Sequence, residues 1–296
     1  MSKISSSPFK ITLLGTGCPA VSTTRFGPAT LVECGGLIVL VDVGSGVTQR
    51  LLAAGHNGAD IDAVLITHLH SDHLVDLYQL IISSWHQSRD KPQRIFGPPG
   101  IKKLITDTMD VWKTERNWRI AFEQRTSVEA FDIDVIEFND EKPLYDDGCI
   151  IRPVRVSHEP VDPAFGFIFE AHGVKAVISG DTKVSENLIS VSDGADLLVH
   201  EVFVHGGIPV SGTRSQQGLA NVASYHTLSD DVGKVANAAN VKALALTHIV
   251  PSDSDREELL TAVRKFYSGP VFVGEDLMQF DLVRRRMRHG DTFCSF

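Results

Sequence analysis

The sequence predicts an α/β fold in which helices cover two packed β-sheets. Short runs of aliphatic and β-branched residues recur along the chain and are bounded by glycine-containing turns, a pattern that predicts strands. Stretches with helical spacing of apolar residues follow these runs in each part of the chain. Because the rhythm of strands followed by helices occurs twice, we expect two similar β-rich halves packed against each other.

The predicted elements divide into halves of roughly residues 1–130 and 131–296. The predicted strands are Lys10–Leu14, Thr30–Glu33, Leu37–Val41, Ala63–Thr67, Asp132–Glu137, Ile150–Val156, Gly166–Glu170, Lys175–Ile178, Leu197–His200, Ala243–Leu246 and Val271–Val273. The predicted helices are Val47–Ala54, Leu74–Ser84, Ile101–Trp112, Asp230–Asn240 and Ser254–Phe266. No low-complexity linker separates the halves, so we expect residues 1–296 to form a single domain. The basic tail is interpreted as a solvated end; its arginines are Arg284, Arg285, Arg286 and Arg288.

Composition and charge restrict the class of protein. The 296 residues are 43% hydrophobic and 22% charged, as in globular proteins with a sizeable core. The net charge of −9 disfavours a protein that binds nucleic acid over its whole surface. We find no apolar run of about 18 residues for a membrane span and no secretory signal at the N-terminus. The four cysteines form no C-x-x-C pair and require no disulfide, so we expect a reducing, cytoplasmic location.

The strongest chemical signal is a cluster of potential metal ligands after the predicted strand Ala63–Thr67. His68, His70, Asp72 and His73 lie within six positions of one another. In extended backbone, residues two apart point to the same side, so His68 and His70 can reach one ion. Asp72 and His73 come as the chain turns toward the next helix and can approach from another side. Imidazole and carboxylate ligands suit zinc, manganese or iron, whereas the alternative interpretation is an ordinary polar loop.

Three further polar residues stand just beyond predicted strands. His158, Asp181 and His248 each follow an apolar run, and each alone is more typical of a cap or turn. Together they repeat one arrangement at the sheet edge where loops converge, and loops on a rigid scaffold often carry binding residues. A catalytic metal site also keeps an open position for water or substrate. We therefore expect these residues to extend the first cluster into a catalytic site.

These motifs resemble the metallo-β-lactamase superfamily, and most closely its ribonuclease Z and arylsulfatase-like branch. The fragments that carry the resemblance extend over nearly the whole chain and are Leu14–Gly17, His68–His73, Ser179–Thr182, His200-Glu201, His226-Thr227 and Thr247-His248. The resemblance implies a four-layer αββα sandwich of two pseudo-repeated halves. It also implies a metal-dependent hydrolase that forms a homodimer.

The same resemblance implies the ligands of two divalent metal ions. One ion is expected at His68, His70 and His158, the other at Asp72, His73 and His248, and Asp181 is expected to bridge them. Zinc is the expected metal, with manganese and iron as alternatives. Two such ions about 3.5–4 Å apart can lower the pKa of a shared water and neutralise charge on a substrate oxygen. Asp72 is either a ligand alone or also orients this water.

A second histidine is implied in the chemistry itself. In ribonuclease Z, the residue that matches His226 lies near the reacting phosphate and pairs with the residue that matches Glu201. A positioned imidazole can protonate a leaving group or stabilise a transition state. The alternative is that His226 is a loop residue beside the helix that follows it.

The substrate class remains open. The preferred interpretation is a hydrolase of a small sulfate ester, phosphate ester or lactone-like compound; the alternative is a tRNA 3′-processing endonuclease of the ribonuclease Z type. That group typically carries a long tRNA-binding arm between the residues matching His158 and Asp181, which here are 181 − 158 = 23 positions apart. The short gap and the net charge of −9 favour a small molecule over nucleic acid. A metal protein without activity is disfavoured, because a site kept only for folding rarely needs a bridging carboxylate.

Four further residues are candidates for substrate binding because they lie near the motifs in sequence: Arg25, Trp85, Phe165 and Phe203. Apolar walls are usual in small-molecule sites, and an arginine can bind an anion through two hydrogen bonds. The alternative is that the three aromatic residues belong to the core and that Arg25 has a structural role.

Overall fold

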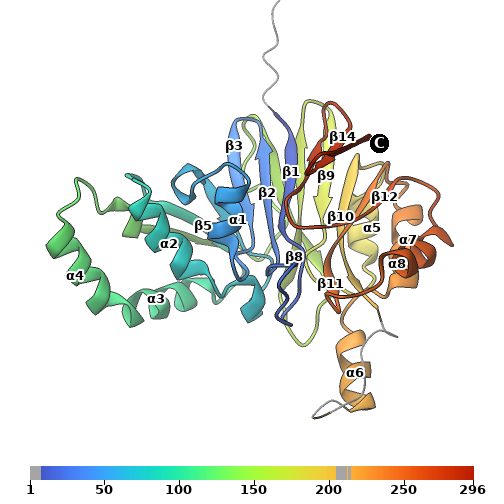
Figure 1. Ribbon diagram of the computed structural model, residues 1–296, viewed down its shortest axis with the longest axis horizontal. Helices are drawn as coiled ribbons and strands as arrows, with labels where there is room; N and C mark the ends of the chain where they lie inside the picture. Colours follow the sequence, from blue (N-terminus) through green and yellow to red (C-terminus); the bar gives the residue numbers. More distant parts are fainter. Residues whose placement is uncertain (1–7, 205–211, 213–214) are drawn as a thin grey trace, which may run out of the picture.

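Two β-sheets pack face to face and helices cover their outer faces in the computed structural model, which describes residues 8–204, 212 and 215–296 (Figure 1). The larger sheet has nine strands in the order β15-β14-β13-β1-β2-β3-β4-β5-β6. The smaller sheet has six strands in the order β12-β11-β10-β9-β8-β7. This arrangement confirms the αββα sandwich that the sequence predicts.

The larger sheet combines residues from both ends of the chain. Its strands are β1 (Lys10–Gly15), β2 (Ala29–Cys34), β3 (Leu37–Val41), β4 (Ala63–Leu65), β5 (Gln93–Gly97), β6 (Ile133–Glu137), β13 (Met278–Asp281), β14 (Arg286–His289) and β15 (Thr292–Ser295). Strand β13 pairs with β1, and β14 and β15 extend the sheet beyond it. The basic tail is therefore built into a sheet, where Arg286 and Arg288 belong to β14, and the side chains of both are exposed to solvent as expected.

The smaller sheet carries the other half of the sandwich. Its strands are β7 (Ile150–Val156), β8 (Ala164–Ala171), β9 (Val174–Ile178), β10 (Leu197–Phe203), β11 (Leu244–Val250) and β12 (Val271–Val273). Strands β7, β8 and β9 are antiparallel neighbours, whereas β9 to β12 run parallel. The chain passes from the larger to the smaller sheet between Glu137 and Ile150, somewhat later than the predicted boundary near residue 130.

The helices are short and lie outside the sheets. They are α1 (Val47–Ala53), α2 (Leu77–His86), α3 (Ile101–Val111), α4 (Lys113–Glu123), α5 (Glu186–Val191), α6 (Gln216–Ala223), α7 (Ser229–Ala238) and α8 (Arg256–Arg264). Helices α4, α5 and α6 were not predicted; α4 and α6 bury no residue, so the core covers neither of them. Within the described ranges, every helix is too short or too polar to cross a membrane.

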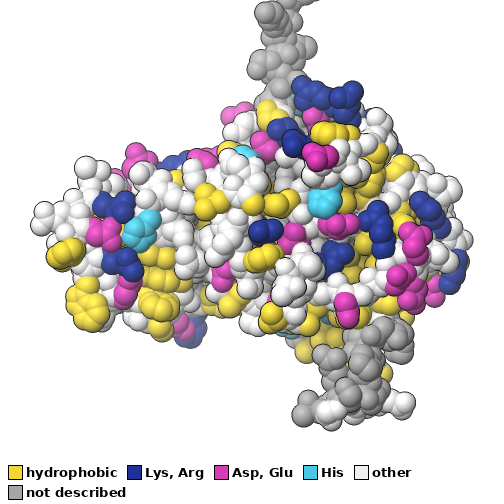
Figure 2. All heavy atoms as spheres, in the orientation of Figure 1, with side chains coloured by type: hydrophobic (Ala, Val, Ile, Leu, Met, Phe, Trp, Pro, Cys, Tyr) yellow, Lys and Arg dark blue, Asp and Glu magenta, His cyan; other side chains and the backbone are white. Residues whose placement is uncertain are grey.

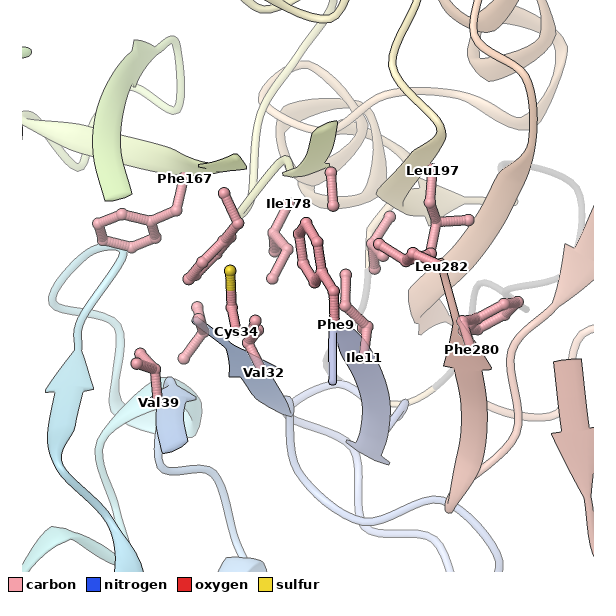
Figure 3. Packing of buried hydrophobic residues seen from close by; sticks show 14 of the residues in the cluster. Phe9, Ile11, Val32, Cys34, Val39, Phe167, Ile178, Leu197, Phe280 and Leu282 are labelled. Atoms are coloured by element: carbon pink, nitrogen blue, oxygen red, sulfur yellow. The ribbon is translucent and has the colours of Figure 1, made fainter. Parts of the chain in front are cut away.

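The main core lies between the sheets, where apolar side chains from both point toward one another (Figure 3). Phe165, Phe167 and Phe169 alternate along β8 and are all buried, as expected when one face of a strand meets a core. Opposite them lie residues of β1 and β2, among them Ile11 and Val32. Burial of each such phenylalanine stabilises the fold by about 1.5–3 kcal/mol. The core therefore holds the two sheets in a fixed relation.

A disulfide also joins the two sheets. Cys34 at the end of β2 is bonded to Cys149, which directly precedes β7 and lies 115 positions away. The adjacent glycines allow the close approach, since a Cβ on Gly35 would collide with the backbone of Gly148. This bond departs from the expectation that the cysteines require no disulfide; Cys18 and Cys294 are free. Cysteine spacing along the sequence does not reveal a contact between residues so far apart.

Loss of the disulfide should destabilise the protein substantially. By the loop-entropy relation, closing a loop of this length contributes about 4–5 kcal/mol, with native-state strain reducing the value. We expect Cys34→Ser to lower the free energy of unfolding by about 3–5 kcal/mol in denaturant titrations without reductant. The control is Cys294→Ser at the exposed free cysteine. Equal stability of both variants would show that the disulfide does not form in solution.

Candidate metal centre

Loops that follow strands of both sheets bring the predicted ligands together. From the larger sheet, His68 and His70 follow β4, and the single 3₁₀ turn Ser71–His73 carries Asp72 and His73. From the smaller sheet come three more residues: His158 after β7, Asp181 after β9 and His248 within β11. All seven lie in two adjoining groups whose ligand atoms are within 4.8 Å of one another inside each group. The first is His68, His70, His158 and Asp181, and the second is Asp72, His73 and His248.

The first group is built around the Nδ1 atom of His70. This atom lies 3.0 Å from Nε2 of His68 and 3.2 Å from Nε2 of His158. The same two Nε2 atoms are 3.9 Å and 3.8 Å from Oδ2 of Asp181. Three imidazole nitrogens and one carboxylate oxygen therefore surround a single point, which is the donor set that a zinc-type ion takes.

The second group shares the same carboxylate oxygen. Oδ2 of Asp181 lies 3.4 Å from Nε2 of His73 and 3.3 Å from Nε2 of His248. Oδ2 of Asp72 approaches these two nitrogens from the other side, at 3.6 Å and 3.3 Å. The carboxylate of Asp181 therefore stands between the two groups, where a bridging ligand would be.

An irregularity in β11 directs His248 into the centre. The parallel register with β10 matches Glu201 to Thr247 and then Val202 to Ile249, so His248 is an extra, unmatched residue. Its φ of 43° is in the left-handed region. Such bulges bend a strand and re-aim a side chain near active sites. The sequence predicts that the strand ends before His248, whereas the strand continues past it to Val250.

Outer hydrogen bonds fix which nitrogen each histidine offers. Asp42, at the end of β3, accepts hydrogen bonds from Nδ1 of His73 at 2.8 Å and from the Thr67 hydroxyl at 2.8 Å. Because the Thr67 proton goes to Asp42, its oxygen accepts from Nδ1 of His68, 3.0 Å away. Nδ1 of His158 donates to the carbonyl of Tyr225 at 2.9 Å. In these three histidines Nε2 is left to face the centre, as in other metal sites.

The electrostatics differ between the two groups. Burial lowers the pKa of His68, His70 and His158, so these imidazoles are neutral and ready to act as ligands. Burial also acts to lower the pKa of His248, but the Asp181 carboxylate and the hydrogen bond with Asp72 outweigh it and raise this pKa to about 9. His248, in the second group, is thus protonated at neutral pH when no cation is bound.

The residues fit a pair of divalent cations. Nε2 of His73 is buried and has no hydrogen-bond partner among the described residues, although it faces two carboxylates. A buried polar atom without a partner is costly, and a bound cation would satisfy it. Burial acts to raise the pKa of Asp181, yet His248 and His73 hold it well below its usual value. The centre thus presents the charged carboxylate that metal coordination requires.

His226 stands beside this centre and is held by Glu201. Nδ1 of His226 donates to Oε1 of Glu201 at 2.9 Å, and the same oxygen accepts from the backbone N–H groups of Thr182 and Thr227. The ligand atoms of His226, Asp181 and His248 lie within 4.8 Å of one another. The ring of Phe203 stacks on His226 with centroids 5.8 Å apart. The predicted pairing of His226 with Glu201 is therefore present.

Known proteins resemble the chain over most of its length. A family model described as anti-Pycsar protein Apyc1 matches residues 9–214. Ribonuclease Z of Mycobacterium bovis (strain BCG / Pasteur 1173P2) is 36% identical over 286 residues, covering 94% of this chain and 99% of that protein. Ribonuclease Z of Mycobacterium tuberculosis (strain ATCC 25618 / H37Rv) is 35% identical with the same coverage, 94% and 99%. The chain belongs to the family of that model and to the ribonuclease Z branch of the metallo-β-lactamase superfamily.

Solved structures agree on the fold. The metallo-β-lactamase fold protein YhfI from Bacillus subtilis has a TM-score of 0.73 at 20% identity, covering 93% of this chain and 99% of that one. Human tRNase Z, short form, has a TM-score of 0.68 at 24% identity, covering 92% and 99%. With its His and Asp clusters, this member of the ribonuclease Z branch is a metal-dependent hydrolase.

The four residues proposed for substrate binding have other surroundings. Trp85 and Phe165 are 1% exposed; the Trp85 indole donates to the carbonyl of Ser127, and Phe165 belongs to the core between the sheets. Phe203 is also 1% exposed and contacts His226. The core interpretation therefore describes Trp85 and Phe165, whereas Phe203 is buried against a residue of the centre and its role in substrate binding stays a prediction. Arg25 bonds to backbone and hydroxyl oxygens, as described below.

Sequence reasoning overlooked Asp42 and Tyr225. Asp42 follows an apolar strand, as Asp181 does. Its φ of 61° is in the left-handed region, which aspartate tolerates better than most residues. Tyr225 adjoins His226 in sequence, and its ring lies 4.9 Å from that of His158. The signal for Asp42 was present in the sequence, whereas the backbone contact of Tyr225 depends on tertiary structure.

Replacing Asp42 tests how far this outer carboxylate supports the centre. Asp42→Asn preserves the shape but removes the charged acceptor for His73, so we expect metal affinity to fall about 10–100-fold. Competition with a chelator measures this affinity. Asp134→Asn on β6, whose side chain is 51% exposed, is the control. Unchanged affinity in Asp42→Asn would show that His73 needs no orienting carboxylate.

Metal affinity should depend steeply on pH. In the metal-free protein the pKa of His248 is raised to about 9, so an incoming cation must displace a proton. We expect apparent zinc affinity to increase up to about tenfold per pH unit between pH 6 and 9. The stabilising contribution of protonated His248 to the metal-free fold is complete below about pH 6.5 and is lost as the pH rises through about 9. Affinities that stay flat over this range would contradict the assignment of His248 as a ligand.

Proposed function

We propose that this chain is a phosphodiesterase of the ribonuclease Z type that cleaves RNA, with tRNA 3′ ends as the substrate. The relatives named ribonuclease Z, at 35–36% identity over nearly their whole length, support this substrate over the small esters that the sequence favours. The observation that carries the proposal is the His226–Glu201 pair beside the ligand cluster. A hydrolase of phosphodiesters needs a proton donor for the alcohol that leaves, and this pair supplies one.

The proposed ligands are those of the two groups described above, with Asp181 as the bridge. Bound divalent cations, zinc being the proposed metal, would lower the pKa of a water molecule and neutralise charge on the phosphate oxygens. Asp72 is proposed both to bind and to orient the attacking water, because its carboxylate lies at the edge of the second group and is half-buried.

His226 is proposed to protonate the leaving oxygen from Nε2. Its Nδ1 is committed to the hydrogen bond with Glu201, so Nε2 is the ring nitrogen left for the substrate. As the water oxygen bonds to phosphorus, its proton passes to the carboxylate of Asp72, and as the phosphorus–oxygen bond to the leaving alcohol breaks, the proton on Nε2 passes to that alcohol. Stacking on Phe203 and the hydrogen bond to Glu201 hold the orientation of the ring, so the imidazole needs no reorientation during the step.

A second candidate is a hydrolase of a small phosphate or sulfate ester. It is favoured by one observation, the short connection between His158 and Asp181, which holds β8, β9 and little else. An RNA substrate would then have to be held by surfaces other than an arm at this position. Precursor tRNA, bis-p-nitrophenyl phosphate and p-nitrophenyl sulfate, offered to one preparation, separate these candidates.

Assembly as a homodimer stays a prediction. Apolar side chains gather on the surface at the α3–α4 end of the molecule (Figure 2). They include Val111, Trp112, Trp118 and Phe122, the last 91% exposed. Light scattering of the purified chain would give its oligomeric state directly.

His226→Ala should slow catalysis without loss of metal. We expect kcat for precursor tRNA cleavage to fall about 10²–10⁴-fold, because proton donation to the leaving group is removed. Metal content by elemental analysis should equal that of the unmodified protein. His86→Ala on α2 is the matched control, and Asp181→Ala is the contrast that should lose metal and activity together. Loss of metal from His226→Ala would reassign His226 as a ligand.

A further inference from the structure

A pocket of about 390 Å³ opens directly beside the metal centre. One wall is the loop of residues 18–27 between β1 and β2, and the other includes Ser71, Asp72 and Val75 around the 3₁₀ turn. Because Asp72 belongs both to this lining and to the second ligand group, a molecule in the pocket would reach the reacting atoms. The volume is within the range of small-ligand sites.

The pocket walls are apolar and poorly covered. Val21 is 101% exposed and Val75 61% exposed, and they line the pocket from two segments that are far apart in sequence. Pro19, Ala20 and Phe26 line the same space. Exposed valines are unremarkable singly, but two that flank one pocket offer a surface that an apolar or aromatic group would cover.

The loop that forms one wall is held rigidly by Arg25. Its guanidinium donates to the Ser252 carbonyl at 3.0 Å, the Thr16 hydroxyl at 2.7 Å and the Gly274 carbonyl at 2.5 Å. Asp276 fastens the same loop by accepting from the backbone N–H of Phe26 at 2.8 Å. Arg25, predicted as an anion ligand, thus has a structural role that leaves the pocket preformed.

The charge of the lining restricts the ligand. Among the described residues that line it, Arg25 and Asp72 are the only charged ones, and they are opposite in sign. A charged ligand would be attracted by one of these side chains and repelled by the other, so it would gain little binding energy. A flat, neutral ring with polar edges can instead contact the valines and the hydroxyls of Ser22 and Ser45. A nucleobase has these properties.

The position of the pocket shows which side of the substrate it takes. His226, the proposed proton donor to the leaving oxygen, is absent from the lining, which instead meets the centre at Asp72. The leaving alcohol must lie next to His226. The pocket is therefore beside the ester group that stays on phosphorus.

We propose that this pocket is a subsite for one nucleobase, namely that of the nucleoside that remains esterified to phosphate after cleavage. The inference rests on the proposed phosphodiesterase activity and adds the base-binding role of Val21 and Val75. It applies to a diester of any length, because only the nucleoside next to the reacting phosphate enters the pocket.

Two chromogenic diesters with the same leaving group test the subsite. One is thymidine 5′-(p-nitrophenyl phosphate), and the other is methyl p-nitrophenyl phosphate, in which a methyl group replaces the nucleoside. We expect the ratio of kcat/KM for the thymidine ester over the methyl ester to fall about tenfold in a Val21→Ser, Val75→Ser double variant, mainly through KM. Val111→Ser, at a valine 77% exposed on α3, should keep the original ratio. Calorimetric affinity for thymidine 5′-monophosphate should fall in parallel.

The outcomes separate the subsite from the activity. If the unmodified protein hydrolyses both esters but the double variant keeps the ratio and the affinity for thymidine 5′-monophosphate, the subsite is overturned while the proposed function stands. If the unmodified protein hydrolyses neither ester and leaves precursor tRNA intact, the proposed function fails and the subsite with it. Ala20→Trp gives an independent check, since an indole in the pocket should exclude the base and lower the same ratio.

Discussion

Oδ2 of Asp181 lies within 3.9 Å of imidazole nitrogens from four histidines, and those histidines come from both sheets. A buried carboxylate is tolerable only where positive charge or hydrogen-bond donors surround it. Its surroundings exist only when the sheets are packed in the observed relation, so the core and the centre depend on each other. Residues behind the ligands also belong to this arrangement. Asp42 and Thr67 form hydrogen bonds with each other and with the ligands His73 and His68.

Much of the fold and most of the ligand set could be predicted because both depend on local patterns. Apolar runs of the right length mark strands whatever their neighbours, and the strands of the sandwich were found in this way, except for β5 and the three C-terminal strands β13, β14 and β15. The cluster from His68 to His73 is likewise local in sequence. The roles of Glu201 and His226 came only from the family resemblance, since neither residue has distinctive spacing.

Features that arise from tertiary contact could not be predicted. The bulge at His248 exists because β11 pairs with β10, and no residue near it signals an extra position. Trp85 was expected near substrate from its place in sequence, but helix α2 turns it toward Ser127. The Cys34–Cys149 bond requires knowledge of how the sheets meet. Because such bonds are uncommon in reducing compartments, the cytoplasmic location stays a prediction that the pairing does not favour.

The disulfide and the metal centre lie at opposite ends of the same two elements. Cys34 precedes β3 and Asp42 follows it, while Cys149 precedes β7 and His158 follows it. The two sheets are thus linked at both ends of these strands, by the disulfide at one end and at the other by a metal centre whose ligands come from both sheets. Chelation removes only the link at the metal centre, so the disulfide and the core still join the two sheets. In a reduced chain without metal, neither link is present and the apolar core alone joins the two sheets.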